Sequence, residues 1–182
     1  MFFKYRYIPN YLSLLRIILT PIFIFTILQN TLVFKIVSLS IFFIASLSDF
    51  LDGYIARKYN FITNFGKNID PLSDKILIVA SFIVLSILFP NEVTFWMVFL
   101  IIFRDIAVTL LRYYKLNTSS PLKTSFLAKR KTLVQIIIIH FILILNVYDT
   151  SYILNNSYIY YLMWLLVILT WYSAIPYFLN KK

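Results

Sequence analysis

The sequence has 182 residues, of which 61% are hydrophobic and only 13% are charged, with a formal net charge of +10. Soluble domains carry about 25% charged residues, so a chain this apolar is expected to need lipid as part of its solvent. The absence of cysteine excludes disulfides, thiolate nucleophiles and cysteine-bound metals. The positive charge favours membrane lipids and phosphorylated substrates as partners, and excludes nucleic acid because no basic stripe follows a soluble face. The length fits one domain, residues 1–182.

Six apolar segments follow one another along the chain, and each is long enough to cross a membrane as a helix. They run from about Tyr11–Leu28, Leu32–Leu51, Pro71–Phe89, Thr94–Tyr114, Thr132–Val147 and Tyr158–Leu179. The second is expected to continue as a helix to Arg57, and Pro21 is a candidate kink in the first. No signal-peptide cleavage site is visible, so the first segment is expected to be retained. The sequence therefore predicts an all-α integral membrane bundle of six transmembrane helices.

Basic residues gather in alternate connections between these segments. They lie at the N-terminus, in the second-to-third link, in the fourth-to-fifth link and at the C-terminus: Lys4, Arg6, Arg57, Lys58, Lys67, Arg112, Lys115, Lys123, Lys129, Arg130, Lys131, Lys181 and Lys182. The other links contain no lysine or arginine. By the positive-inside rule, both termini are expected to be cytoplasmic in a multi-pass cell-membrane protein.

Four of the seven acidic residues lie within one short stretch of the chain. Asp49 and Asp52 are three residues apart, and Asp70 and Asp74 are four apart, so each pair is expected to lie on one face of a helix. Asp70 is also expected to sit at a helix start, just before Pro71. The short link between the second and third helices makes them antiparallel neighbours. The four carboxylates are then expected to converge at the cytoplasmic ends of these helices.

Four converging carboxylates would repel one another, and divalent cations are the natural compensation. Oxygen ligands favour Mg²⁺, Mn²⁺ or Ca²⁺, and two ions such as Mg²⁺ or Mn²⁺ could bridge the phosphates of a substrate. Both glycines, Gly53 and Gly66, lie in the same stretch, where a backbone without side chain allows close approach. The pattern predicts phosphoryl transfer. A cation transporter is an alternative, although acids at one end of the bundle disfavour a path across it; a catalytically silent scaffold is a third possibility.

The stretch resembles the signature of the CDP-alcohol phosphatidyltransferase family, D-x2-D-G-x2-A-R followed by G-x3-D-x3-D. The matching residues are Asp49, Asp52, Gly53, Ala56, Arg57, Gly66, Asp70 and Asp74, with eight residues between Arg57 and Gly66. The six predicted spans fit the family as well, so the resemblance covers nearly the whole chain.

The resemblance implies a role for each matching position. Asp49, Asp52 and Asp70 would ligate metal, and Asp74 would be both a metal neighbour and the general base. Residues that would bind CDP-diacylglycerol are Asn10, Ser13, Gly53, Ala56, Arg57, Thr63 and Gly66. Among them, Gly53 and Ala56 would leave room for cytidine, Arg57 would hold its phosphates and Thr63 would offer a hydroxyl. The resemblance also implies a homodimer.

Three further segments resemble the phosphatidylglycerophosphate synthase subfamily. Pro9–Arg16 resembles the opening P-N-x-[LIV]-[ST]-x-x-R, and Asn10, Ser13 and Arg16 fall on one helical face. Arg104–Arg112 resembles R-E-x3-[TS]-x-x-R, with Asp105 in place of glutamate, and Ala128–Thr132 resembles G-K-x-K-T, with alanine in place of glycine.

The cations of these segments suit an acceptor that carries a phosphate. Arg112 and Lys129, followed by Arg104 and Lys131, are expected to bind sn-glycerol 3-phosphate through charge-assisted hydrogen bonds. A pair between Arg104 and Asp105 is expected to be awkward, because neighbours on a helix point in different directions. Lys115, Lys123 and Arg130 are assigned to the positive-inside bias instead. The lone His140 is expected to have a packing or interhelical hydrogen-bond role.

The expected reaction therefore transfers the phosphatidyl group of CDP-diacylglycerol to sn-glycerol 3-phosphate, giving phosphatidylglycerophosphate and CMP at a cytoplasmic site. The main alternative is the same transfer to serine, inositol phosphate or phosphatidylglycerol. A phosphorylated acceptor is favoured because a neutral one would not need the second group of cations.

Overall fold

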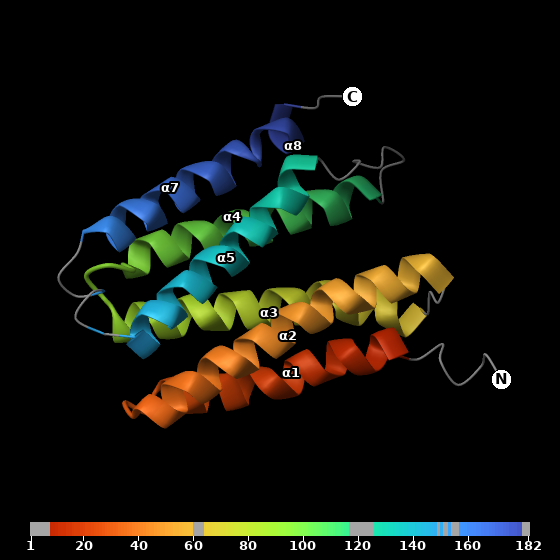
Figure 1. The fold of residues 1–182 in the computed structure, drawn as a ribbon. Helices are drawn as coiled ribbons and strands as arrows, with labels where there is room; N and C mark the ends of the chain where they lie inside the picture. The colour runs from red at the N-terminus through yellow and green to blue at the C-terminus, as the bar shows by residue number, and fades with distance from the viewer. Residues whose placement is uncertain are drawn as a thin grey trace. The chain divides into compact units, whose positions relative to one another are not determined.

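The computed structural model is helical, with no strand among the residues that it describes (Figure 1). Its described backbone comprises residues 8–59, 64–116, 126–148, 150, 153 and 157–179, and its described side chains comprise residues 10–51, 73, 75–111, 130–148, 150, 153 and 157–177. The helices are α1 (Ile8–Ile27), α2 (Leu32–Tyr59), α3 (Asn64–Leu88), α4 (Phe95–Leu116), α5 (Phe126–Tyr148), α7 (Tyr158–Tyr172) and α8 (Ile175–Leu179). The predicted all-α class is confirmed.

Helix α3 starts earlier than the sequence suggests. It begins at Asn64, so Gly66 and Asp70 have helical backbone, and the prediction of a helix start at Asp70 is wrong. Proline fixes φ near the helical value, and the chain can therefore continue as a helix through Pro71 with the loss of one backbone hydrogen bond. Helix α1 likewise continues through Pro21.

The last predicted span is divided in two. Helix α7 ends at Tyr172, Ser173 and Ala174 form a turn, and α8 begins at Ile175. Pro176 explains the break, because it has no N–H to donate to the carbonyl of Tyr172 and its ring would clash with that carbonyl. The amide of Ala174 instead bonds the carbonyl of Trp171 at 2.9 Å, which tightens the end of α7.

Four segments within the described residues are long and apolar enough to cross a membrane. These are Asn10–Ile27, Leu32–Leu51, Arg130–Tyr148 and Tyr158–Tyr177, and Lys75–Leu88 is a shorter apolar helix. The described side chains of α4 cover residues 95–111, an apolar run that contains Arg104 and Asp105. Large apolar side chains lie exposed on these helices, including Phe25, Phe43 and Ile168, as expected of surfaces in contact with lipid.

The chain divides into two compact units, Met1–Val84 with Leu143–Tyr148 and Leu85–Ile142 with Asp149–Lys182. In the first unit, α1 and α2 form a helical hairpin (Figure 1). Most of the buried residues of α1 recur every three or four positions, at Ser13, Arg16, Thr20, Phe23 and Ile27. This spacing places them on one face of the helix, and Phe23 meets Phe42 of α2 with ring centroids 5.6 Å apart.

Buried hydroxyl groups of the first unit are satisfied by their own helices. Thr20 donates to the carbonyl of Arg16 at 2.8 Å, Ser48 to that of Ala45 at 2.7 Å and Ser81 to that of Leu77 at 2.8 Å. Small polar residues can therefore be buried between apolar helices without leaving an unpaired group. They also permit close approach of the two backbones.

In the second unit, α4 packs against α7. The rings of Phe103 and Trp171 stack with centroids 6.4 Å apart, and Val108 of α4 forms a buried cluster with Ala174 and Tyr177. The break after α7 thus places the α7–α8 turn against the second half of α4.

Candidate functional site

The first polar feature is a buried ion pair between α1 and α2. Nη1 of Arg16 donates to Oδ1 of Asp49, the first of the four motif aspartates. The Arg16 side chain is only 1% exposed, whereas that of Asp49 is 34% exposed. Phe23 lies seven residues after Arg16 on α1 and Phe42 lies seven residues before Asp49 on α2, so their contact fits the same antiparallel register. The packing of the hairpin therefore places a permanent positive charge against a predicted metal ligand.

Asp49 fits a role in binding a divalent cation. Its carboxylate is partly exposed, and a carboxylate oxygen is the ligand that Mg²⁺ and Mn²⁺ prefer. No group of three or more acidic, histidine or cysteine side chains is found within the described residues. The side chains of Asp52, Asp70 and Asp74 lie outside that part of the chain.

Of the residues predicted to bind CDP-diacylglycerol, two have described side chains. Ser13 is buried and Asn10 is partly buried, and both lie N-terminal to Arg16 on the same face of α1. The backbone of Gly53, Ala56, Arg57 and Gly66 is helical, but their side-chain positions are outside the described residues, as is all of Thr63.

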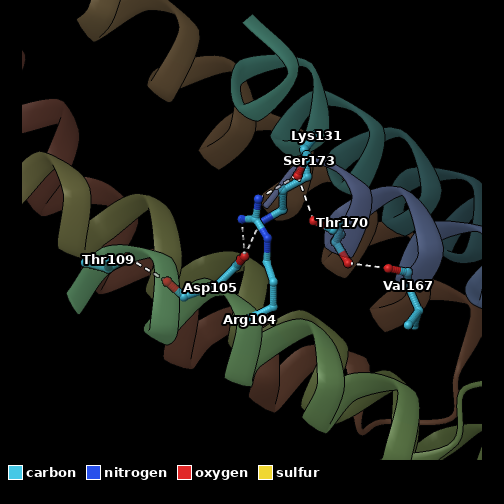
Figure 2. A network of polar contacts seen from close by, with 7 residues as sticks. All are labelled: Arg104, Asp105, Thr109, Lys131, Val167, Thr170 and Ser173. Carbon is cyan, nitrogen blue, oxygen red and sulfur yellow. Dashed lines mark hydrogen bonds and ion pairs between the residues drawn. The ribbon is translucent and has the colours of Figure 1, made fainter. Parts of the chain in front are cut away.

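The second polar feature joins α4, α5 and the α7–α8 turn (Figure 2). Arg104 donates through Nη1 to Oδ1 of Asp105 at 3.0 Å and through Nη2 to Oγ of Ser173 at 2.6 Å. Nζ of Lys131 contacts the same Oδ1 of Asp105. Arg104 and Lys131 are 4% and 8% exposed, so both cations are buried within the chain. The two described candidates for the acceptor site thus meet at one carboxylate.

The expectation that Arg104 and Asp105 would pair poorly is wrong. Their Cα–Cβ bonds do point in different directions on α4. The arginine side chain is nevertheless long enough for its guanidinium to lie beside the carboxylate, as Figure 2 shows. Asp105 itself is held mostly inside, with 15% of its side chain exposed.

Hydrogen bonds along α7 extend this network. Oγ of Ser173 donates to the carbonyl of Thr170 at 2.7 Å, and Oγ1 of Thr170 donates to the carbonyl of Val167 at 2.7 Å (Figure 2). On α4, Oγ1 of Thr109 donates to the carbonyl of Asp105 at 2.6 Å. Ser173 can therefore accept a hydrogen bond from Arg104 while its own proton is already used, which fixes the orientation of the hydroxyl.

The remaining acceptor candidates cannot be placed in the same way. Arg112 and Lys129 lie in α4 and α5, but their side chains are outside the described residues. Arg130 is exposed. His140 contacts the carbonyl of Ile136 on its own helix at 2.9 Å through Nδ1.

Three residues in these contacts, Arg16, Asp105 and Ser173, are not among the site residues that the sequence predicts. Arg16 stands in a recognised motif, but its partner depends on how α1 and α2 pair. Asp105 was dismissed as a partner for Arg104 because of its position alone. Ser173 is in no motif, and only the break caused by Pro176 could have drawn attention to it. A buried charge in an apolar helix is the signal that was available for the first two.

These features define an α-helical protein with apolar helices of membrane-spanning length and buried ion pairs between them. A family model described as CDP-alcohol phosphatidyltransferase matches residues 6–172. The chain belongs to the CDP-alcohol phosphatidyltransferase family.

Several curated relatives share the same name, CDP-diacylglycerol–glycerol-3-phosphate 3-phosphatidyltransferase. The protein of Rickettsia bellii is 33% identical over 171 residues, which cover 94% of this chain and 93% of the relative. The protein of Bacillus subtilis is 38% identical over 151 residues, covering 76% and 77%. That of Haemophilus influenzae is 34% identical over 135 residues, covering 71% of each chain.

Proposed function

We propose that this protein is an enzyme that transfers the phosphatidyl group of CDP-diacylglycerol to sn-glycerol 3-phosphate, forming phosphatidylglycerophosphate and CMP. The observation that supports this most directly is its similarity, over 94% of the chain, to a relative named for that reaction. The complete family signature from Asp49 to Asp74 agrees with it. The buried cations of α4 and α5 favour an acceptor that carries a phosphate.

The aspartates of the signature divide into ligands and a base. Asp49, Asp52 and Asp70 hold two divalent metal ions, Mg²⁺ or Mn²⁺, with Asp74 as their neighbour. When bound, such ions neutralise charge on the diphosphate and on the departing CMP. Asp74 accepts the proton of the primary hydroxyl of the acceptor. A general base of this kind contributes roughly 10²–10⁴-fold to the rate.

The bonds that change are those at one phosphorus atom. The acceptor oxygen forms a bond to the phosphorus that carries diacylglycerol, and the bond from this phosphorus to the oxygen of CMP breaks. The electron pair of the broken bond leaves with CMP, and the proton passes to Asp74. Asn10, Ser13, Gly53, Ala56, Arg57, Thr63 and Gly66 bind the CDP-diacylglycerol.

The acceptor phosphate is bound by cations from α4 and α5. Arg112 and Lys129 are its main ligands, and Arg104 and Lys131 assist them. The network of Figure 2 supports this assignment, because two of these cations are buried against one shared anion and keep a net positive charge of one with it.

The enzyme crosses the cell membrane six times as a single domain, with both termini and the active site on the cytoplasmic side, and it forms a homodimer. The alternation of basic and uncharged links supports this topology. The third and fourth spans correspond to α3 and α4, and the sixth to α7 with α8.

The decisive experiment is an assay of purified protein for CMP release from CDP-diacylglycerol. We expect turnover with sn-glycerol 3-phosphate in the presence of Mg²⁺ or Mn²⁺, and loss of turnover when EDTA removes the metal. Serine, inositol phosphate and phosphatidylglycerol serve as competing acceptors in parallel reactions. Faster CMP release with any of these three would reassign the acceptor, and no release with any acceptor would reject the transferase reaction.

A further inference from the structure

One carboxylate oxygen gathers two cations from different helices. Oδ1 of Asp105 accepts from Nη1 of Arg104 on its own helix and from Nζ of Lys131 on α5. Without this carboxylate, two positive charges more than nine-tenths buried would face each other. Buried like charges repel strongly where water is scarce. Asp105 therefore makes it possible for Arg104 and Lys131 to lie together inside the chain.

The single negative charge of Asp105 contacts two positive charges. Arg104, Lys131 and Asp105 together have a net charge of +1. The Nε–H of Arg104 is buried and has no hydrogen-bond partner among the described residues. A buried cation with an unused donor is costly, and it is a suitable binding partner for a further anion. A phosphate monoester has oxygen atoms enough to bond both cations while Asp105 keeps its place.

The orientation of Arg104 is fixed from two sides. Nη1 bonds Asp105 at 3.0 Å, and Nη2 bonds Ser173 at 2.6 Å. The hydroxyl of Ser173 is itself oriented by the carbonyl of Thr170. A guanidinium is a rigid planar fork, so two anchored nitrogens determine the direction of the third. Preorganised cations bind an anion more tightly, because less side-chain freedom is lost on binding.

We propose that Asp105 is a positioning residue for the acceptor phosphate: it collects Arg104 and Lys131 into one cationic site, and Ser173 anchors the other arm of Arg104. This rests on the proposed function, in which these cations bind sn-glycerol 3-phosphate. It adds a role for Asp105, the acidic position of the segment Arg104–Arg112, and for Ser173, which is in no motif. Asp105 touches neither substrate nor metal in this scheme and acts through the two cations.

Asp105→Asn tests the proposal, because the amide keeps the shape of the side chain and removes its charge. The KM for sn-glycerol 3-phosphate is expected to rise roughly tenfold, the equivalent of one well-placed charge-assisted interaction. The KM for CDP-diacylglycerol and the CMP released at saturating acceptor are expected to stay within about twofold of the parent enzyme. Asp105→Glu, which restores a carboxylate, is expected to recover most of the acceptor affinity.

Thr170→Val is the matched control. It removes a buried hydroxyl from the same network but leaves the contacts of Arg104 in place, because Ser173 bonds the backbone carbonyl of Thr170. Both KM values are expected to stay unchanged. Ser173→Ala supplies a second test if Asp105→Asn does not fold, and it is expected to raise the acceptor KM roughly threefold, less than the loss of the shared carboxylate.

The KM values of these variants distinguish a positioning role of Asp105 from a purely structural one. An unchanged or lower acceptor KM in Asp105→Asn would overturn the proposal; a lower KM would identify Asp105 as a competitor of the phosphate. An equal rise in the KM values for both substrates in Asp105→Asn would show a purely structural role. If Asp105→Asn cannot be made, an unchanged acceptor KM in Ser173→Ala would show the same. Failure of the proposed function is distinct, because the parent enzyme itself would then release no CMP with sn-glycerol 3-phosphate.

Discussion

Arg16 is almost completely buried, although it is a charged residue in an apolar helix. Its contact with Asp49 offsets part of the large cost of removing a guanidinium from water. Asp49 is about one-third exposed, so the carboxylate keeps part of its hydration while it neutralises Arg16. Asp49, a predicted metal ligand, therefore also stabilises the hairpin of α1 and α2.

We expect Arg16→Met to destabilise the protein by about 3 kcal/mol, at the lower end for a broken buried ion pair because Asp49 is partly exposed. Methionine fills a similar volume, so the loss reports charge rather than a cavity. The measurement is the apparent melting temperature of the purified protein in detergent with EDTA present, which should fall clearly below that of the parent protein.

The double variant Arg16→Met with Asp49→Asn provides the control for this pair. The two changes should be markedly less destabilising together than the sum of the single changes, because each alone already removes the interaction between these two charges. Additive losses would show that the two residues do not depend on each other. Ser40→Ala, at an exposed position of α2, should leave the melting temperature unchanged.

For single residues, the sequence predicted which residue types form the site better than it predicted which side chains they contact. The spacing of Asp49 and Asp52, and the family signature, were sufficient to select the acidic residues. The pair between Arg16 and Asp49, which are 33 positions apart along the chain, could not be derived because it depends on the register between α1 and α2. Arg104 and Lys131 were selected as cations, but their common contact with Asp105 depends on side-chain reach, which helical periodicity does not describe.

The α1–α2 hairpin depends on small side chains where the two helices meet. Ala45 has no exposed surface, and the buried Ser38 and Ser48 lie on the same face of α2. Without water to drive helices together inside a membrane, close packing and hydrogen bonds must hold them. Small residues at the contact allow the backbones to approach closely.

Ala45→Leu is expected to destabilise this hairpin by about 1–3 kcal/mol, because the added carbon atoms cannot be accommodated in a packed contact. Ser40→Leu, which adds similar volume at an exposed position of the same helix, should have little effect. The measurement is again the melting temperature in detergent. A similar loss in both variants would show that the face of α2 around Ala45 is not a tight contact.

The all-α class was readable from the apolar runs, but the ends of the helices were not. The sequence placed the start of the third helix at Pro71 and ran the last helix to Leu179, whereas α3 begins at Asn64 and α7 ends at Tyr172. Hydropathy reports which residues can lie in lipid, and a helix can extend beyond that region into polar sequence. The effect of a proline also depends on context: α1 continues through Pro21, and Pro176 ends α7.

The distribution of basic residues along the whole chain predicts its orientation in the membrane. Basic residues concentrate in every second link between the apolar segments, whereas residues 28–31 after α1 and 89–94 after α3 contain none. In the cell membrane, short loops rich in lysine and arginine stay on the cytoplasmic side. The connection between α1 and α2 should then face outward, as should that between α3 and α4, whereas the basic link between α4 and α5 should face the cytoplasm.

The absence of native cysteine allows a direct test of this orientation. Single variants Asn30→Cys and Asn91→Cys, at exposed positions in the first and third connections, should react with a membrane-impermeant maleimide added to intact spheroplasts. Ser119→Cys, in the basic link between α4 and α5, should react only after the membrane is opened. The cysteine-free parent supplies the background. Labelling of Ser119→Cys in sealed spheroplasts, or protection of both asparagine variants there, would contradict a cytoplasmic active site.

The predicted pattern requires an odd number of crossings between Asn91 and Ser119, and α4 is the helix between them. The labelling would therefore also decide whether this helix, with Arg104 and Asp105 in its middle, crosses the membrane.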